Sequence, residues 1–332
     1  MADSSADQPL VSIVLPTYKR AYVLPSAIGS VLGQTYRNLE LIVVDDNSPD
    51  ATRDVVAAFS DPRIRYVRNE PNLKLPRALN RGFSLSRGEY LTWTSDDNLY
   101  GENAIEKMVA VMRQRKYDFV YADYYHFADL DAEGRPLEIR HHKLPDTLQL
   151  EKGNHLGACF MYTREVYEAV GEYDPELFLV EDYDYFMRIA KRFRMGHIAE
   201  PLYYFRRHDD ALYVSRYCEV KASDILGRYK NHLLSDAEVL EAIVTLLLRD
   251  PDGLHKPLLR LSHRWVHKRS YTLTKWHEEL SAAYLRRRLR SCVSRLLEDY
   301  RSQSIAFGVA RDRLCGAMKE LGAIAYNETP IR

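Results

Sequence analysis

Short apolar runs alternate with amphipathic stretches over residues 10–123. β-Branched and aliphatic residues fill four runs that end in turn-forming or charged residues, and this pattern predicts buried strands. The strands are predicted at residues 11–15, 39–44, 63–67 and 89–94. Residues 24–32 and 51–59 carry apolar side chains at helical spacing, and Ser48 or Asp50 is placed to cap the second helix. Alternating strands and helices predict a mainly parallel sheet with right-handed crossovers and helices on both faces.

The pattern changes along the rest of the chain. Over residues 124–210 the signals are mixed, and from 211 onward almost every stretch is helical in pattern, with a break at 251–253. Strands are expected at 118–122, 158–163, 197–199 and 203–206, and helices at 164–170 and 182–193. The domains are therefore expected as a flexible N-terminus at 1–9, an α/β domain at 10–210 with halves 10–123 and 124–210, and an all-α domain at 211–332.

Composition and charge narrow the function classes. The chain is 46% hydrophobic and 28% charged with zero formal net charge, so it has a globular composition and gives no overall argument for nucleic-acid binding. No apolar run approaches the roughly 20 residues of a membrane span. The polar, acidic segment 1–8 lacks the features of a secretory signal, and the four cysteines form no CxxC pair. We expect a cytoplasmic protein with buried free thiols.

Acidic pairs follow several of the predicted elements. They are Asp45–Asp46, Asp96–Asp97 and Glu181–Asp182. Ligands of parallel α/β sheets bind beyond the carboxyl ends of the strands. Carboxylates at that edge suit a hard divalent cation, and such a cation stabilises a departing diphosphate. By spacing alone, a simple capped turn at residues 94–98 explains the pattern equally well.

Several motifs in fixed order resemble the family 2 glycosyltransferases with the GT-A fold. The matching segments are residues 11–18, 30–36, 40–48, 80–82, 88–90 and 94–98. The resemblance covers about residues 10–210 and is nearest to the spore-coat polysaccharide type, because the motif at 94–98 reads Thr-Ser-Asp-Asp-Asn. It implies an inverting transferase that moves a sugar from a nucleotide diphosphate to an acceptor hydroxyl, in polysaccharide or glycoconjugate synthesis.

The resemblance also implies roles in donor binding. Tyr18 would stack on the base and Asp46 would accept the uracil N3–H, which favours a UDP-sugar or dTDP-sugar. Lys74 and Arg77 lie where the family has basic residues facing the diphosphate, although solvated loop charges are an equally good interpretation. The remaining residues implied in donor binding are Pro16, Thr17, Ser95 and Asp96.

The implied metal site holds Mn²⁺ or Mg²⁺. Asp97 would be its principal ligand, and His208 lies where some relatives have a histidine near the metal, an acceptable ligand for Mn²⁺. Thr94 replaces the first carboxylate of the usual Asp-x-Asp motif, which leaves two adjacent acids. Neighbours on a strand point to opposite faces, so we expect one direct protein carboxylate and weak metal affinity.

The motif at residues 180–184 corresponds to the family's Glu-Asp motif and implies an acceptor side. Asp182 stands at the position of the catalytic base, which would take the proton of the attacking hydroxyl. Glu181 and Gly157 would border the acceptor. The competing interpretation is that the acidic residues only cap the helix that follows.

The helical tail has an uneven charge. Residues 256–295 hold eleven Lys and Arg against two Glu, with Trp and Tyr interleaved. Such a surface suits anionic lipid, so the protein could bind peripherally at the inner face of a membrane. That location would suit a lipid-linked acceptor, with a saccharide acceptor as the alternative. It equally suits acidic residues of this chain or of a second copy, giving a homo-oligomer through the C-terminal helices. No recognition motif supports nucleic acid.

Two other functions are weighed against transfer. The turn after the first strand, residues 16–21, has no glycine, which argues against a dinucleotide-dependent oxidoreductase and makes a sugar nucleotidyltransferase a poorer match. A non-catalytic relative that binds nucleotide sugar or acts as a scaffold stays open because of Thr94.

Overall fold

The computed structural model describes residues 8–208 and 217–235, the single residues 238 and 242, and two short strands, β10 (Tyr271–Thr272) and β11 (Ala325–Tyr326). The chain divides into two compact units, Met1–Ala211 and Leu212–Arg332. In the second unit, α8 spans Tyr217–Lys230 and β10 pairs antiparallel with β11. Apart from β10, the basic segment 256–295 lies outside the described residues, as do the break at 251–253 and the helices expected to form an oligomer. No helix of the described residues has the length and apolarity to cross a membrane.

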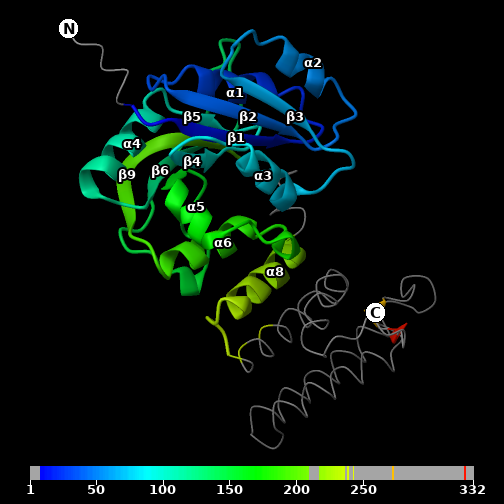
Figure 1. Cartoon of the computed structure of the whole chain (residues 1–332), viewed down its shortest axis with the longest axis vertical. Coiled ribbons are helices and arrows are strands. Elements are labelled where there is room, and N and C mark those ends of the chain that lie inside the picture. Colours follow the sequence, from blue (N-terminus) through cyan, green and yellow to red (C-terminus); the bar gives the residue numbers. More distant parts are fainter. Residues whose placement is uncertain are drawn as a thin grey trace, which may run out of the picture. The chain divides into compact units, whose positions relative to one another are not determined.

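The first unit begins with four parallel strands. These are β1 (Val11–Thr17), β2 (Leu39–Asp45), β3 (Ile64–Arg68) and β4 (Tyr90–Trp93), in the spatial order β3-β2-β1-β4. The connecting helices are α1 (Leu24–Leu32), α2 (Thr52–Ala57) and α3 (Leu75–Ser84). Helices α1 and α2 lie on one side of these strands and α3 on the other (Figure 1). The predicted α/β architecture is confirmed.

The same sheet continues through the second half of the unit. Its further elements are β5 (Leu99–Tyr100), α4 (Ala104–Arg115), β6 (Phe119–Phe127), β7 (Arg140–His142), β8 (Phe160–Thr163), α5 (Arg164–Val170), α6 (Glu181–Ala190) and β9 (Met195–Arg206). Short 3₁₀ turns lie at Leu150–Lys152 and Pro175–Leu177. The order continues β4-β8-β6-β9-β5, with β7 paired to β6. Strands β6 and β9 are parallel to each other, whereas β8 runs antiparallel to both β4 and β6.

Two local predictions differ from the structure. The strands expected at 197–199 and 203–206 are one strand, β9, whose register against β6 shifts near Pro201. Proline lacks a backbone N–H, so the pairing is interrupted there without ending the strand.

The predicted cap of the second helix also differs from the structure. Helix α2 has Ala51 at its N-cap position. Asp50 accepts the Thr52 N–H at 3.2 Å, whereas the Ser48 hydroxyl accepts the Lys19 N–H at 3.0 Å.

Strand direction determines where the site forms. Strands β1, β2, β4, β6 and β9 all point the same way, so the loops that follow them leave the sheet at one edge. Because β8 is antiparallel, the segment that enters it reaches the same edge; Phe160, its first residue, pairs with Tyr121 of β6, and Thr92 of β4 bonds its carbonyl oxygen at 2.6 Å. Segments far apart in the sequence therefore meet there.

Candidate active site

The turn between β4 and β5 presents Asp96 to the end of β1. The Thr17 hydroxyl donates to Asp96 Oδ2 at 2.8 Å, and Arg20 Nε lies 3.9 Å from Oδ1. Burial and the neighbouring Asp97 carboxylate raise the pKa of Asp96 to about 7, against the opposing effects of Arg20 and Thr17. Thr17 and Asp96, both implied in donor binding, are therefore joined by a direct hydrogen bond.

Asp97 lies in a cluster with two residues from other loops. Its Oδ2 is bonded by Arg20 Nη1 and lies 3.1 Å from His208 Nε2, while Arg20 Nη1 and His208 Nε2 are 3.5 Å apart. His208 follows β9, and the Asn98 side chain accepts the N–H of Arg206 at 2.8 Å, which fixes the end of that strand beside the turn. The fold thus brings together Asp97 and His208, and adds Arg20.

The chemistry of this cluster fits a divalent ion with few protein ligands. Two ligands about 2.1 Å from an octahedral ion are about 3.0 Å apart, close to the 3.1 Å between Asp97 Oδ2 and His208 Nε2. Carboxylate oxygen and imidazole nitrogen both suit Mn²⁺. Over the described parts of the chain, no three His, Cys, Asp or Glu side chains converge as a metal group. Water and diphosphate oxygens would therefore complete the ligand set.

Thr94, which replaces a motif carboxylate, has a structural contact. It is 1% exposed, and its hydroxyl lies 2.6 Å from the Tyr203 hydroxyl of β9. A buried hydroxyl with a partner at this distance is satisfied within the core. Thr94 therefore connects the turn to β9. Its hydroxyl is used in this contact, which argues against a role as a metal ligand.

Asp46 holds the loop that leads into α3. Its carboxylate accepts hydrogen bonds from Asn69 Nδ2 at 2.9 Å, the Leu73 N–H at 2.8 Å and the Lys74 N–H at 2.9 Å. A carboxylate has about four acceptor positions, so these three bonds leave room for one more donor. Its role toward a base stays a prediction.

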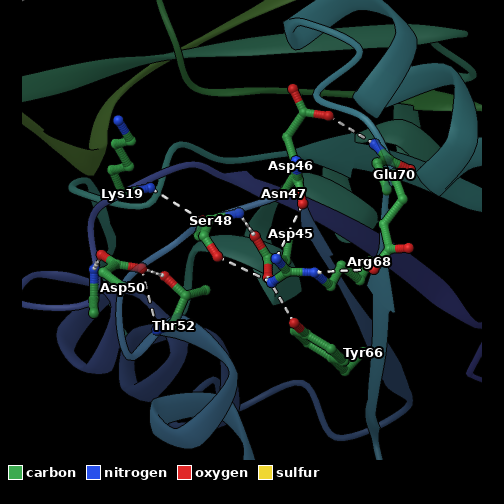
Figure 2. Close-up of polar contacts among 12 residues, drawn as sticks. Lys19, Asp45, Asp46, Asn47, Ser48, Asp50, Thr52, Tyr66, Arg68 and Glu70 are labelled. Atoms are coloured by element: carbon green, nitrogen blue, oxygen red, sulfur yellow. Dashed lines mark hydrogen bonds and ion pairs between the residues drawn. The ribbon is translucent and has the colours of Figure 1, made fainter.

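The preceding residue, Asp45, is fully buried and connects β2 to β3 through hydrogen bonds. It accepts from the Tyr66 hydroxyl at 2.6 Å, Arg68 Nη1 at 2.7 Å and the Ser48 N–H at 2.7 Å, as Figure 2 shows. Its partners lie on β3 and on the turn after β2. The first acid of the Asp45–Asp46 pair is therefore structural, and only the second is available near the edge.

The other residues implied in donor binding line the loops of the same edge. Tyr18 is 42% exposed, and Lys74 and Arg77, at the start of α3, are exposed. Pro16 and Ser95 are half-buried. The exposed Tyr18 ring has a free face for stacking, but no contact of the described residues tests these assignments.

Glu181 and Asp182 begin α6 and form the second carboxylate group. Asp182 Oδ2 accepts from Asn154 Nδ2 at 3.2 Å, and Oδ1 accepts the Tyr183 N–H at 2.7 Å. Glu181 is 4% exposed and accepts the Leu179 N–H at 2.8 Å. Burial raises the pKa of Asp182, and burial together with Asp182 raises the pKa of Glu181 to about 8. The pair therefore holds one proton at neutral pH.

Asn154 and Gly157 connect this pair to the sheet edge. Both lie on the segment that enters β8, and Asn154 is the residue of that segment whose side chain donates to the Asp182 carboxylate. Gly157 has φ +79°, and a Cβ there would lie 2.5 Å from Cε1 of Tyr124. Only glycine fits this turn against the ring. The N-cap residue of α6, Val180, makes no side-chain cap bond, whereas Asp182 accepts the first-turn N–H of Tyr183, so the acidic pair also stabilises the start of the helix.

Sequence reasoning missed Arg20 and Asn154. Neither has a distinctive spacing: Arg20 follows a basic residue in a loop, and Asn154 lies in a polar stretch without periodicity. The one available signal for Arg20 was a cation close after a strand whose edge was expected to carry carboxylates.

Comparisons with known proteins agree with this geometry. The family model described as glycosyl transferase family 2 matches residues 12–171. A glycosyltransferase of unassigned role from Rickettsia felis is 33% identical over 198 residues, 55% of this chain and 32% of that protein. From Escherichia coli, the UDP-Glc:alpha-D-GlcNAc-diphosphoundecaprenol beta-1,3-glucosyltransferase WfgD is 33% identical over 141 residues, 42% of this chain and 56% of WfgD. The chain thus spans about a third to a half of the length of these two relatives.

Solved structures show the same fold at low sequence identity. Staphylococcus aureus TarS 1-349 in complex with UDP-GlcNAc has a TM-score of 0.54 and 15% identity, covering 94% of this chain and 90% of that one. The mannosyltransferase PcManGT from Pyrobaculum calidifontis, in complex with GDP-Man and Mn²⁺, has a TM-score of 0.53 and 16% identity, covering 96% and 88%. The GT-A fold is confirmed, while the nearer likeness to the spore-coat type stays a prediction.

One relative is matched over most of its own length. The putative colanic acid biosynthesis glycosyl transferase WcaA of Escherichia coli K12 is 33% identical over 190 residues, 55% of this chain and 67% of WcaA. The family model covers the acidic pairs Asp45–Asp46 and Asp96–Asp97 and ends before Glu181–Asp182. Together with the match to WcaA, it shows that the chain belongs to glycosyltransferase family 2.

Proposed function

We propose that this chain is an inverting glycosyltransferase that moves a sugar from a UDP-sugar or dTDP-sugar to an acceptor hydroxyl, with Mn²⁺ or Mg²⁺, in polysaccharide or glycoconjugate synthesis. The observation that carries the proposal is the Asp182 carboxylate. Its pKa is raised by burial, and it accepts a hydrogen bond from Asn154, on the segment that enters β8. Sugar transfer by a single displacement would need Asp182 as the base, with Asp96 and Asp97 on the side of the leaving diphosphate.

The donor would lie over the ends of β1, β2 and β4. Tyr18 would stack on the base, and the remaining acceptor position of Asp46 would take the N3–H of uracil or thymine. Lys74 and Arg77 would face the diphosphate, with Pro16, Thr17, Ser95 and Asp96 beneath the ribose. WfgD is named for a UDP-Glc donor and the TarS structure is a complex with UDP-GlcNAc, which supports the choice of base.

Asp97 and His208 would hold the divalent ion, which when bound neutralises the charge that develops on the leaving diphosphate. Asp182 would accept the proton of the acceptor hydroxyl as oxygen attacks the anomeric carbon from the opposite side. Its raised pKa makes it a stronger base than an exposed carboxylate. Glu181, protonated beside it, would leave Asp182 as the ionised member of the pair.

The acceptor would border Gly157, Glu181 and Asp182. WfgD is named for a lipid-linked acceptor, which supports a lipid-linked saccharide here. The basic segment 256–295 would then lie on an anionic membrane surface, or would join two copies of the chain. Binding to vesicles with and without anionic lipid, at two salt concentrations, separates these two roles from each other.

The test is release of the nucleotide diphosphate from UDP-sugars and dTDP-sugars with Mn²⁺. Asp182→Asn should lower turnover by about 10²- to 10⁴-fold, the usual contribution of a general base, while UDP binding measured by calorimetry stays within about twofold. Asp54→Asn, a change in the same charge at an exposed position of α2, serves as the matched control and should leave turnover unchanged.

Three results would contradict the proposal. Wild-type protein that binds UDP without turning over any donor is a non-catalytic binding module. Release of pyrophosphate from a nucleoside triphosphate and a sugar phosphate indicates a nucleotidyltransferase. An Asp182→Asn variant as active as wild type places the base elsewhere.

A further inference from the structure

Arg20 makes a contact that the proposed catalytic roles do not use. Its guanidinium Nη1 bonds Asp97 Oδ2, the oxygen that also lies 3.1 Å from His208 Nε2, and its Nε lies 3.9 Å from Asp96 Oδ1. The Asp97 side chain is 12% exposed and that of Arg20 26%. The guanidinium thus lies among the groups that would hold a divalent ion.

A guanidinium and a divalent ion exclude each other at this oxygen. Arginine carries only donor N–H groups and stays charged, so it is unable to ligate a metal. A cation within about 2.1 Å of Asp97 Oδ2 would occupy the space of the Arg20 bond and repel its charge. Of the three members of the cluster, Asp97 and His208 stay when an ion binds, and Arg20 leaves.

The backbone around Arg20 is fixed by hydrogen bonds to neighbouring residues, while its guanidinium contacts Asp96, Asp97 and His208. The Lys19 N–H is bonded to Ser48 at 3.0 Å and the Ala21 N–H to Asp50 Oδ2 at 3.1 Å (Figure 2). The Arg20 carbonyl accepts the N–H groups of Val23 and Leu24, both at 3.2 Å. Displacement therefore needs rotation of one side chain and no movement of the loop.

We propose that Arg20 is a resident counter-ion of the metal site, which the divalent ion displaces from Asp97 and which then pairs with the nucleotide diphosphate. The inference rests on the proposed function of this edge. A displaced guanidinium has lost its carboxylate partner, and diphosphate oxygens offer it charge-assisted bonds. The ion alone binds weakly as a result, and ion and nucleotide bind cooperatively.

The experiment measures Mn²⁺ binding directly, by the spectroscopic signal of the free ion, without and with saturating UDP. Arg20→Ala should bind Mn²⁺ alone about tenfold or more tightly than wild type, because a competing charge is removed from Asp97. The factor by which UDP tightens Mn²⁺ should fall by about the same amount, and the reciprocal effect of Mn²⁺ on UDP must fall equally.

Two further variants separate charge from general effects. Arg63→Ala removes an arginine of similar exposure that pairs with Asp61 at the start of β3, so it changes the net charge equally and should leave Mn²⁺ binding as in wild type. Arg20→Lys keeps a cation and should bind Mn²⁺ less tightly than Arg20→Ala. Circular dichroism and thermal unfolding confirm that each variant is folded.

An Arg20→Ala protein that binds Mn²⁺ no more tightly than wild type overturns the inference, as does equal Mn²⁺ affinity in Arg20→Lys and Arg20→Ala. The readout is independent of turnover. If wild type transfers sugar while Arg20→Ala binds Mn²⁺ unchanged, only this inference fails. If Arg20→Ala binds Mn²⁺ more tightly while wild type turns over no donor, the inference holds and the proposed function fails.

Discussion

At the scale of single residues, the acidic pair at the start of α6 behaves as one unit. Two adjacent buried carboxyls do not both ionise readily, because each charge is poorly solvated and repels the other. Here burial comes first and Asp182 second among the causes that raise the pKa of Glu181 to about 8. We predict that Glu181 is the protonated member of the pair near neutral pH.

Glu181→Gln tests that role through the pH dependence of stability. A carboxyl whose pKa rises from 4.5 when unfolded to about 8 when folded binds more protons in the native state over that range. Its contribution is therefore complete below pH 4.5 and is lost as pH rises toward 8. Gln cannot ionise, so the melting temperature of the variant should fall less than that of wild type between pH 5 and pH 8.

The control for this comparison is Glu102→Gln, at an exposed glutamate. Its melting curve should run parallel to wild type across the pH range. A Glu181→Gln curve that also runs parallel would mean that Glu181 is ionised in the folded protein at neutral pH.

Sequence reasoning reached the residues of the site more easily than their partners. It predicted that Asp97 and His208, which are 111 positions apart, share one metal site. The basis was that both follow predicted strands and that the family resemblance implies a metal role for each. The same reasoning did not find that Arg20 bonds Asp97 or that Asn69, Leu73 and Lys74 converge on Asp46. Those contacts depend on loop conformation, such as φ +69° at Lys74, and periodicity carries no information about it.

At the scale of elements, the sheet was predictable because each early strand is a nearly uninterrupted apolar run. The seven residues of β2 are all buried, and this pattern is typical of a parallel strand covered on both faces. Caps and strand limits were less predictable. Ser48 was a plausible helix cap, yet its hydroxyl accepts the Lys19 N–H of another loop, because a tertiary partner competes with the local one.

Helix α3 lies close against the sheet because of Gly82. A Cβ at this position would lie 2.4 Å from Val14 Cγ1 and 3.1 Å from Val44 Cγ2, side chains of β1 and β2. The helix begins at the loop held by Asp46 and carries Arg77. Its distance from the sheet therefore sets the position of the basic residues proposed to face the donor.

Gly82→Ala should destabilise the protein by about 1–3 kcal/mol, the usual cost of overpacking a core, measured by urea unfolding. Gly29→Ala in α1 is the matched control, since a Cβ there meets nothing within 4 Å; it should be neutral or stabilise by up to about 1 kcal/mol through helix propensity. Equal effects of the two substitutions would contradict the close approach of α3.

At the scale of the whole molecule, the chain combines a family 2 unit with a second unit whose role the relatives do not assign. The family model ends at residue 171, and the matched regions of the curated relatives cover 55% of this chain or less in the three comparisons given. The sequence predicted a helical second unit from the helical pattern of its stretches, without a family motif. The acceptor, membrane and oligomer roles proposed for it therefore rest on residues that no family motif identifies and that the matched regions of these relatives do not assign.

The donor base is the specificity question that the whole protein can answer most directly. The structural neighbours include one complex with UDP-GlcNAc and one with GDP-Man and Mn²⁺, so the fold is compatible with either base. We predict that the remaining acceptor position of Asp46 favours the N3–H of uracil or thymine over cytosine, whose N3 is an acceptor; its three bonds to the 69–74 loop fix its direction. Guanine also carries N–H donors, so its exclusion would depend on the size of a purine rather than on Asp46.

Thermal unfolding with UDP, dTDP, GDP and CMP, each with Mn²⁺, tests this choice. A ligand at 100 times its Kd stabilises the native state by about 2.7 kcal/mol, which for a unit of 150–250 residues raises the melting temperature by about 5–10 °C. UDP or dTDP should give such a rise, and GDP and CMP should give at most about a third of it at the same concentration. Asp46→Asn should remove the difference among the bases, because an amide turned to accept from the loop presents an N–H donor where a pyrimidine donor N–H needs an acceptor. A larger rise with GDP than with UDP would contradict the choice of a uracil or thymine donor.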